Sequence, residues 1–158
     1  MRLTTLVLLA ALAAPAACDA AEDAPPSARA SIPAGADTTL AVAGATFVSL
    51  FPAVTRARLD ADEGVARALK DFEHHLGEAA PVLRAAGVAV HDVTGRRVRL
   101  VAGDPPRPLA GVNADAPRYV LIEPGRAPYV LEGVQTNAAL LRAAAVYFRI
   151  PALQSHAR

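Results

Sequence analysis

The chain has 158 residues, 53% of them hydrophobic and 20% charged, which suffices for one packed domain and excludes a disordered chain. The formal net charge of +1 excludes a broad basic field for nucleic acid. Aromatic residues make up only 4%, so no surface for stacking bases or sugars is expected. No P-loop or dinucleotide-binding glycine motif is found, and we expect no cofactor and no nucleic-acid partner.

The first residues have the layout of a secretory signal. Met1 and Arg2 give a short positive start, residues 3–14 are apolar, and small residues follow as far as Cys18. The apolar run is too short for a stable membrane span. We therefore expect export, with residues 1–17 as the signal peptide.

Cys18 is the only cysteine, and two alanines precede it. This arrangement resembles the lipobox of bacterial lipoproteins, in which the cysteine becomes the lipidated first residue, although Pro15 stands where that pattern prefers leucine. A lone cysteine cannot form an internal disulfide. The resemblance implies a lipid anchor on the periplasmic face of a bacterial membrane. The alternative is ordinary signal cleavage at residues 14–16 or after Ala20, which leaves a soluble exported protein.

A linker and a single domain follow. Residues 18–37 are rich in Ala, Pro, Ser and Asp, which is typical of a flexible tether. We expect the folded domain at 38–150 and a C-terminal tail at 151–158. The strand signal at 45–51 ends at Pro52.

A long amphipathic helix is predicted next. Asp60 or Asp62 offers its N-cap, and Pro81 predicts a kink or a fresh helix start. Apolar residues recur at helical spacing, which indicates a face packed on a core. These residues are Val65, Leu69, Phe72, Leu76 and Leu83.

The rest of the chain alternates strands and turns before a last helix. Val98 and Leu100 are expected to face inward, 119–122 is apolar enough to be a central strand, and Pro128 marks an edge strand. Thr136 is the predicted cap of the last helix. The expected segments are strands 88–93, 97–101, 119–122 and 129–131, turns at 94–95 and 123–126, a loop at 103–116 and a helix at 137–148.

This order of elements resembles the thioredoxin fold. The run Ala116-Pro117-Arg118-Tyr119 to Gly125 is similar to the family stretch in which a cis-proline opens a strand that ends in a glycine turn. Residues 80–83 are similar to the family's proline-kinked helix, and the likeness covers about residues 46–148. It implies an α/β fold with a thioredoxin-like mixed sheet flanked by helices, a C-terminal β-hairpin and a helix.

The same resemblance implies a contact surface without thiol chemistry. Glu73 and Leu76 occupy the positions of the family's C-x-x-C, so no dithiol oxidoreductase activity is expected. In the family, backbone beside the cis-proline pairs with an extended peptide. The expected peptide-binding surface consists of Phe72, Glu73, His74, His75, Leu76, Ala116 and Pro117.

A histidine pair on the long helix offers a second function. Asp71, His75 and Glu78 stand at i, i+4 and i+7, a spacing that suits a set of metal ligands. The neighbouring His74 is a further candidate ligand. A solvated, charge-balanced helix face explains the same spacing. The functional hypotheses are therefore a non-catalytic binding or scaffolding module, a metal-handling protein or enzyme, and a structural part of an envelope assembly.

Other polar residues are expected to have structural roles. Ser49 lacks the flanking motif of a nucleophile and is predicted to be an ordinary strand residue. His91 lies in an apolar strand, and His156 falls in the predicted disordered tail. Arginines at 96, 97 and 99 are interpreted as a solvated strand face that could contact acidic lipid headgroups.

Overall fold

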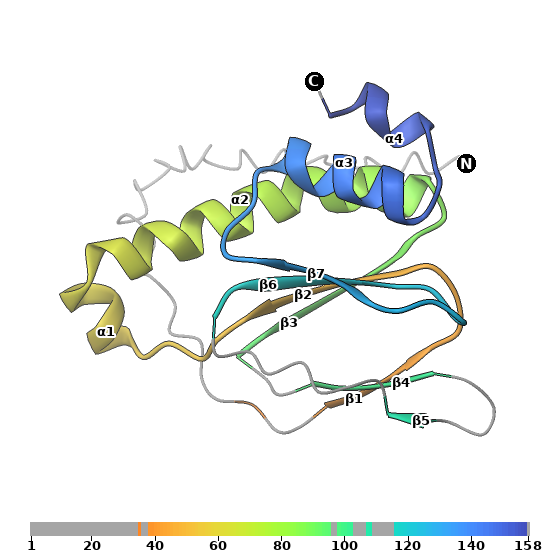
Figure 1. Ribbon diagram of the computed structural model, residues 1–158. Helices are drawn as coiled ribbons and strands as arrows, with labels where there is room; N and C mark the ends of the chain where they lie inside the picture. Colours follow the sequence, from red (N-terminus) through yellow and green to blue (C-terminus); the bar gives the residue numbers. More distant parts are fainter. Residues whose placement is uncertain (1–34, 36–37, 96–97, 103–106, 109–115, 158) are drawn as a thin grey trace, which may run out of the picture.

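The computed structural model describes residues 35, 38–95, 98–102, 107–108 and 116–157. The predicted signal peptide, Cys18, most of the predicted tether and the arginines at 96 and 97 lie outside these residues. A four-stranded sheet has helices on one face and a small three-stranded sheet on the other (Figure 1). The elements in chain order are β1 (Thr38–Val42), β2 (Thr46–Phe51), α1 (Arg56–Ala61), α2 (Glu63–Ala85), β3 (Ala89–Thr94), β4 (Val98–Ala102), β5 (Arg107–Pro108), β6 (Arg118–Ile122), β7 (Tyr129–Glu132), α3 (Asn137–Tyr147) and α4 (Ala152–Ser155).

The central sheet has the strand order β3-β2-β6-β7. Strand β2 is parallel to β3 and antiparallel to β6, and β6 is antiparallel to β7. The predictions of a central strand at 119–122 and an edge strand after Pro128 are confirmed. The turn between them has Gly125 at φ +79°, and the Arg126 N–H donates to the Glu123 carbonyl over 3.1 Å. This is the glycine conformation that a type II turn requires.

The two inner strands supply both faces of the sheet. All six residues of β2 are buried. Because side chains alternate along a strand, Phe47 and Phe51 pack beneath the helices while Val48 and Leu50 pack against the small sheet. Strand β6 repeats this division. The continuous apolar runs in the sequence therefore reflect burial on both faces.

Helix α2 is the main cover of the upper face. The Asp62 side chain accepts a hydrogen bond from the Val65 N–H, which confirms one of the two predicted caps. The prediction of a fresh start at Pro81 is wrong, because one helix runs through it. Pro81 and Gly77 are both exposed, so water can reach the carbonyl that lacks its helical partner. Buried neighbours such as Leu83 hold the helix against the core on its other side.

The small sheet covers the lower face and was only partly predicted. Val98 and Leu100 are buried and Arg99 is exposed, as expected. The turn at Gly95 does not lead to a hairpin, since β4 pairs in parallel with β1 rather than with β3. Strands β1 and β5 were not predicted. Their sequences are short and carry few large apolar residues, so their pairing depends on β4.

The end of the chain is part of the core, which corrects the predicted tail. Helix α4 buries Leu153, and Ala157 is also buried. His156 is exposed and lies at the C-cap of this helix rather than in a disordered segment. The Arg142 side chain donates a hydrogen bond to the Ala157 carbonyl over 3.1 Å. No helix among the described residues has the length and apolar character needed to cross a bilayer.

Candidate functional site

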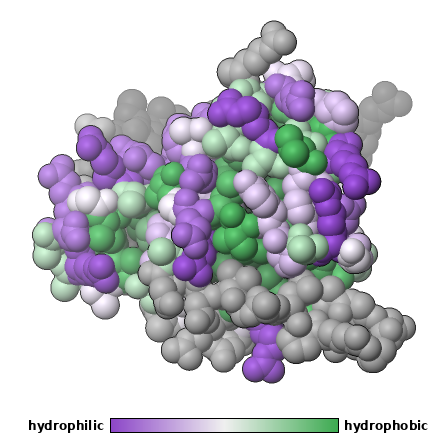
Figure 2. Space-filling view, viewed as in Figure 1, coloured by the Kyte–Doolittle hydropathy of each residue, from purple (hydrophilic) through white to green (hydrophobic). Residues whose placement is uncertain are grey.

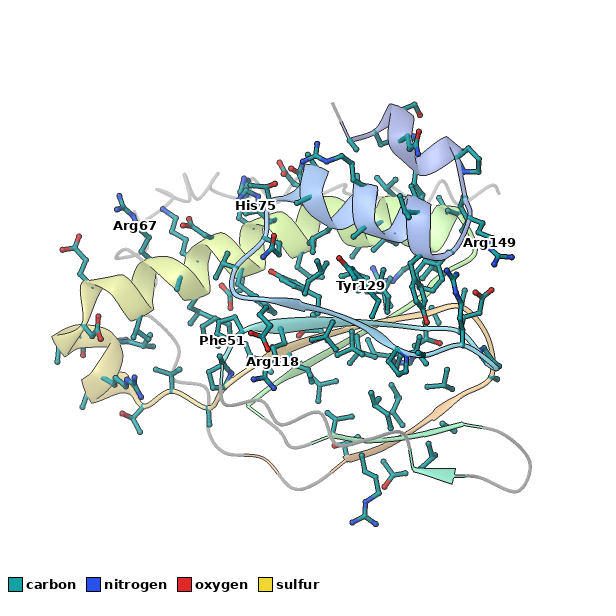
Figure 3. All side chains as sticks on the ribbon, viewed as in Figure 1. Phe51, Arg67, His75, Arg118, Tyr129 and Arg149 are labelled. Carbon is teal, nitrogen blue, oxygen red and sulfur yellow. The ribbon has the colours of Figure 1, made fainter. Side chains whose placement is uncertain are left out.

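Aromatic packing joins the middle of α2 to the start of β6. The Phe72 ring stacks on Tyr119 with centroids 5.1 Å apart and meets Phe51 edge-on at 5.0 Å. Figure 3 shows Phe51 and Arg118 at the same end of the sheet. Since Pro117 directly precedes β6, this packing brings the helix turn at 72–76 near the strand that Pro117 opens. The sequence resemblance had implied this neighbourhood.

The expected peptide-binding surface is only partly available to a partner. Phe72 is fully buried and Leu76 is 7% exposed, so their side chains belong to the core, which corrects that part of the prediction. The same apolar stripe that anchors the helix turns both inward. Glu73 and His74 are exposed. Partly exposed positions are His75, Ala116 and Pro117.

The proline beside β6 is held by the edge strand. The Gly133 N–H donates to the Pro117 carbonyl over 2.8 Å, which extends the β6–β7 pairing by one residue. This carbonyl is therefore already engaged within the chain.

Two buried polar atoms lie along the same part of the molecule. The Tyr119 hydroxyl and the His75 Nδ1 atom have no hydrogen-bond partner of normal geometry among the described residues. Burial raises the pKa of Tyr119 to about 12; the backbone of Gln135 opposes the rise and Asp92 adds to it. Tyr119 is therefore a neutral phenol at physiological pH and no base.

The histidine pair forms a compact cluster on the outer face of α2. Ligand atoms of His74, His75 and Glu78 all lie within 4.8 Å of one another. His74 Nε2 is 3.6 Å from Glu78 Oε1, and the two imidazole centroids are 5.2 Å apart. Asp71, which the sequence spacing had included, does not belong to this cluster. One helical turn thus brings two imidazoles and one carboxylate together, as a transition-metal site requires.

Ser49 and His91 have the structural roles that the sequence indicated. Ser49 is fully buried in β2, and its hydroxyl donates to Asp92 Oδ1 over 3.1 Å. Thr94 donates to the same oxygen over 2.7 Å. His91 is a partly buried residue of β3, opposite Val48. Its hydroxyl also lies 3.4 Å from the backbone carbonyl of His91, an acceptor that is not the imidazole, so these contacts give Ser49 no base of the kind that activates a nucleophile.

A groove between β7 and α3 was not predicted. Its volume is about 510 Å³, and its two charged lining residues are both arginines. Figure 2 shows apolar residues in the middle of this face, where α3 and β7 meet, with polar residues on either side. The signal in the sequence was Tyr129 next to Val130, two large apolar residues in an edge strand. The lining residues are Arg126, Tyr129, Leu131, Ala139, Arg142, Ala143, Val146 and Tyr147.

The chain matches no protein family, no curated protein and no solved structure.

Proposed function

We propose that this chain is a non-catalytic, thioredoxin-like binding module of the bacterial cell envelope, anchored to a membrane through Cys18. The observation that carries the proposal is the central sheet. Its order β3-β2-β6-β7, with β2 parallel to β3 and both other pairs antiparallel, resembles the arrangement of a thioredoxin-like core. The long helix after β2 and the helix after β7 lie on one face, in agreement with that resemblance (Figure 1). The small sheet on the opposite face is a departure from it.

The position of the family's active site supports binding rather than redox chemistry. Glu73 and Leu76 stand where the C-x-x-C would be, and the only cysteine of the chain is Cys18. Thiol–disulfide exchange requires a thiolate at this position. Glu73 is exposed whereas Leu76 is in the core, so this turn of α2 presents a charged surface to a partner.

The contact surface of the module lies at the exposed part of the predicted set. Glu73 and His74 face outward from α2, and Ala116 lies before the strand that Phe72 covers. Backbone pairing with an extended peptide beside Pro117 needs no thiol. Peptide contact at this surface therefore depends on exposed backbone and side chains and needs no redox chemistry.

The first experiment tests whether the chain is anchored to a membrane through Cys18. The full chain, with its own N-terminus, is expressed in a bacterium fed an azide-bearing fatty acid. We expect the wild type to carry the label and to sediment with membranes, and Cys18→Ser to do neither. A mature N-terminus located beyond Cys18 and free of lipid would contradict the anchor.

Site-specific photo-crosslinking tests the second half. A photoreactive residue is placed at His74 and, as a matched control, at Arg67, which is exposed one and a half to two turns earlier on α2. We expect a discrete crosslinked envelope protein from position 74 and none from position 67. The same products from both positions, or none from 74, would count against this contact surface.

A second candidate function is metal handling, favoured by the cluster of His74, His75 and Glu78. Imidazole nitrogen and carboxylate oxygen bind Zn²⁺ at about 2.0–2.2 Å in tetrahedral geometry, so the ligand atoms of one ion lie about 3.3–3.6 Å apart. The ligand atoms here lie within 4.8 Å of one another, so side-chain rotations are needed to complete the site. Three protein ligands leave a further coordination position for water or another ligand.

Zinc binding by the purified full chain tests this candidate. We expect one Zn²⁺ per chain in equilibrium dialysis and at least tenfold weaker binding for His75→Ala, because one of three ligands is lost. His156→Ala is the matched control, since His156 is exposed and outside the cluster. Equal retention of zinc by both variants would remove the candidate.

A further inference from the structure

We propose that the groove between β7 and α3 is a second binding site, which accepts an extended peptide carrying an apolar side chain and a carboxylate two residues apart. The peptide adds to β7 as a further strand. This site lies on β7 and α3, apart from the contact surface on α2. The two binding sites can therefore be tested independently of each other. Four observations carry the inference.

The first is the open edge of β7. Pro117 and Gly133 form a hydrogen-bonded pair, and the register places Glu132 opposite Arg118 and Val130 opposite Val120. Hydrogen-bonded pairs alternate along an antiparallel ladder, so the backbone groups of Val130 and Glu132 point away from β6. The Glu132 carbonyl accepts from Gln135 Nε2 over 2.7 Å. Both backbone groups of Val130 and the Glu132 N–H face the side on which no described strand pairs with β7.

The second observation is where exposed apolar side chains lie. Among the described residues the large exposed hydrophobics are Tyr129, Val130 and Val146, with 47%, 41% and 69% of their surface accessible. Tyr129 and Val146 line the groove, whereas Val130 points to the other face of the sheet, beside the same open edge. Exposed apolar residues grouped at one sheet edge favour a binding site there.

The third observation is the shape of the groove. Tyr129 and Leu131 point to the helical face of the sheet, and α3 presents Ala139 and Ala143 opposite them. Small residues on the helix leave the space that a larger pair would fill. Tyr147 closes one wall, with its ring 6.2 Å from that of Tyr129. Side chains of an added strand that point to this face come every second residue, about 6.6 Å apart, and enter this space.

The fourth observation is charge. The Arg126 guanidinium lies 4.6 Å from the centre of the Tyr147 ring and donates to the Tyr147 carbonyl, while Glu123 lies 3.4 Å away. Arg142 forms no ion pair with any described residue. The rim is therefore cationic, and an acidic side chain of the peptide can pair with an arginine there.

The same charges argue against a second copy of the chain as the occupant. In a symmetric pairing through β7, the groove of each copy meets the groove of the other. That contact would bring Arg126 and Arg142 of both copies together without added carboxylates. An acidic peptide supplies the opposite charge and fills the groove with its apolar side chain.

The test uses the full chain and a fluorescein-labelled peptide in which threonine alternates with valine, leucine and glutamate. We expect saturable binding by fluorescence anisotropy, with a dissociation constant on the order of 100 μM for so small an interface. A peptide with proline in place of its central threonine loses backbone donors and should not bind. Absence of saturable binding for the parent peptide would overturn the proposal.

Variants of the chain test separately how the β7 backbone, the groove and the arginine charge contribute to peptide binding. Val130→Pro removes the outward N–H but leaves the β6 hydrogen bonds intact, and Ala143→Leu fills the groove; each should weaken binding at least tenfold. Arg142→Gln should weaken binding of the glutamate peptide about two- to fivefold but leave its glutamine counterpart unchanged. Arg67→Gln, on α2, makes the same charge change and should have no effect on either peptide.

Two further outcomes bear on the proposal. If Arg142→Gln weakens both peptides equally, its role is structural and the carboxylate preference is wrong. If sedimentation shows a dimer that Val130→Pro abolishes and the peptide does not compete with it, the occupant is a second copy. Lipid labelling at Cys18 and crosslinking at His74 do not depend on these results, so failure here leaves the proposed function intact.

Discussion

The two faces of the central sheet are built from the same strands but covered in different ways. Above β2 and β6, helices enclose a cluster that includes Phe47, Phe51, Phe72 and Tyr119. Below them, a small sheet covers eight buried residues, all aliphatic. Of these two clusters, the one under the helices contains the aromatic rings. Alternation along a strand therefore assigns residues to two layers, and the residue types that fill a layer differ with the element that covers it.

Truncation of one buried leucine on each face of the sheet measures how differently the two covering layers respond to a cavity. Leu83 in α2 and Leu100 in β4 are almost fully buried, and each contacts a different face of the sheet. We expect Leu83→Ala to cost about 4 kcal/mol of unfolding free energy and Leu100→Ala about 2.5 kcal/mol. The larger cost follows because a long helix held at many points cannot collapse into the cavity, whereas a short strand can shift.

Urea denaturation of the purified chain measures both values. Val146→Ala, at an exposed helix position, should change stability by less than about 0.5 kcal/mol and serves as the control. A Leu100→Ala cost equal to or above that of Leu83→Ala would mean that the small sheet is as rigid as the helix layer.

The sequence predicted the upper face well and the lower face poorly. The spacing of Leu69, Phe72 and Leu76 is a local pattern that repeats along the helix. Asp62 and Thr136 mark the starts of two helices, because each side chain accepts a hydrogen bond from a backbone N–H three residues later. Strands β1 and β5 carry no comparable pattern. Their pairing with β4 depends on residues far apart in the chain, which local patterns do not encode.

The candidate sites show the same division. The exposure of Glu73 and His74 follows from helical spacing, and so does the burial of Phe72 and Leu76, which the resemblance to thioredoxin had placed on the surface. The groove beside β7 could not be predicted, because it depends on how closely α3 packs to an edge strand. The absence of Asp71 from the cluster of His74, His75 and Glu78 depends on rotamers, which sequence spacing does not specify.

Among the described residues, the helices and their caps lie on the upper face, and capping adds to the stability of that face. The Asp62 carboxylate accepts from the Val65 N–H over 3.1 Å, and the Thr136 hydroxyl accepts from the Ala139 N–H over 3.2 Å. Each alanine replacement should lower the unfolding free energy by about 1 kcal/mol. Asp62→Asn and Thr136→Ser keep an acceptor and should cost only a few tenths. Equal losses for alanine and for the conservative residue would show that the caps are not what stabilises these ends.

The cluster under the helices contains a buried hydroxyl that lowers the unfolding free energy, whereas the cluster under the small sheet is aliphatic. Tyr119 is fully buried, and its hydroxyl lacks a hydrogen-bond partner of normal geometry among the described residues. Tyr119→Phe keeps the ring that stacks on Phe72 and removes the unpartnered oxygen. We therefore expect a gain of up to about 1 kcal/mol at pH 7, the smallest of these effects and the only one that stabilises.

The pH dependence of stability gives this last prediction a second readout. The pKa of Tyr119 is about 12 in the folded chain and 10.0 ordinarily, so the unfolded chain releases this proton first. This proton leaves the unfolding free energy unchanged below pH 10 and lowers it between pH 10 and 12, by about 1.4 kcal/mol per pH unit. Tyr119→Phe should make the fall in unfolding free energy over that range shallower. Burial also raises the pKa of Tyr147, so part of the fall remains in this variant. An unchanged curve for Tyr119→Phe would mean that its hydroxyl is solvated in the folded protein.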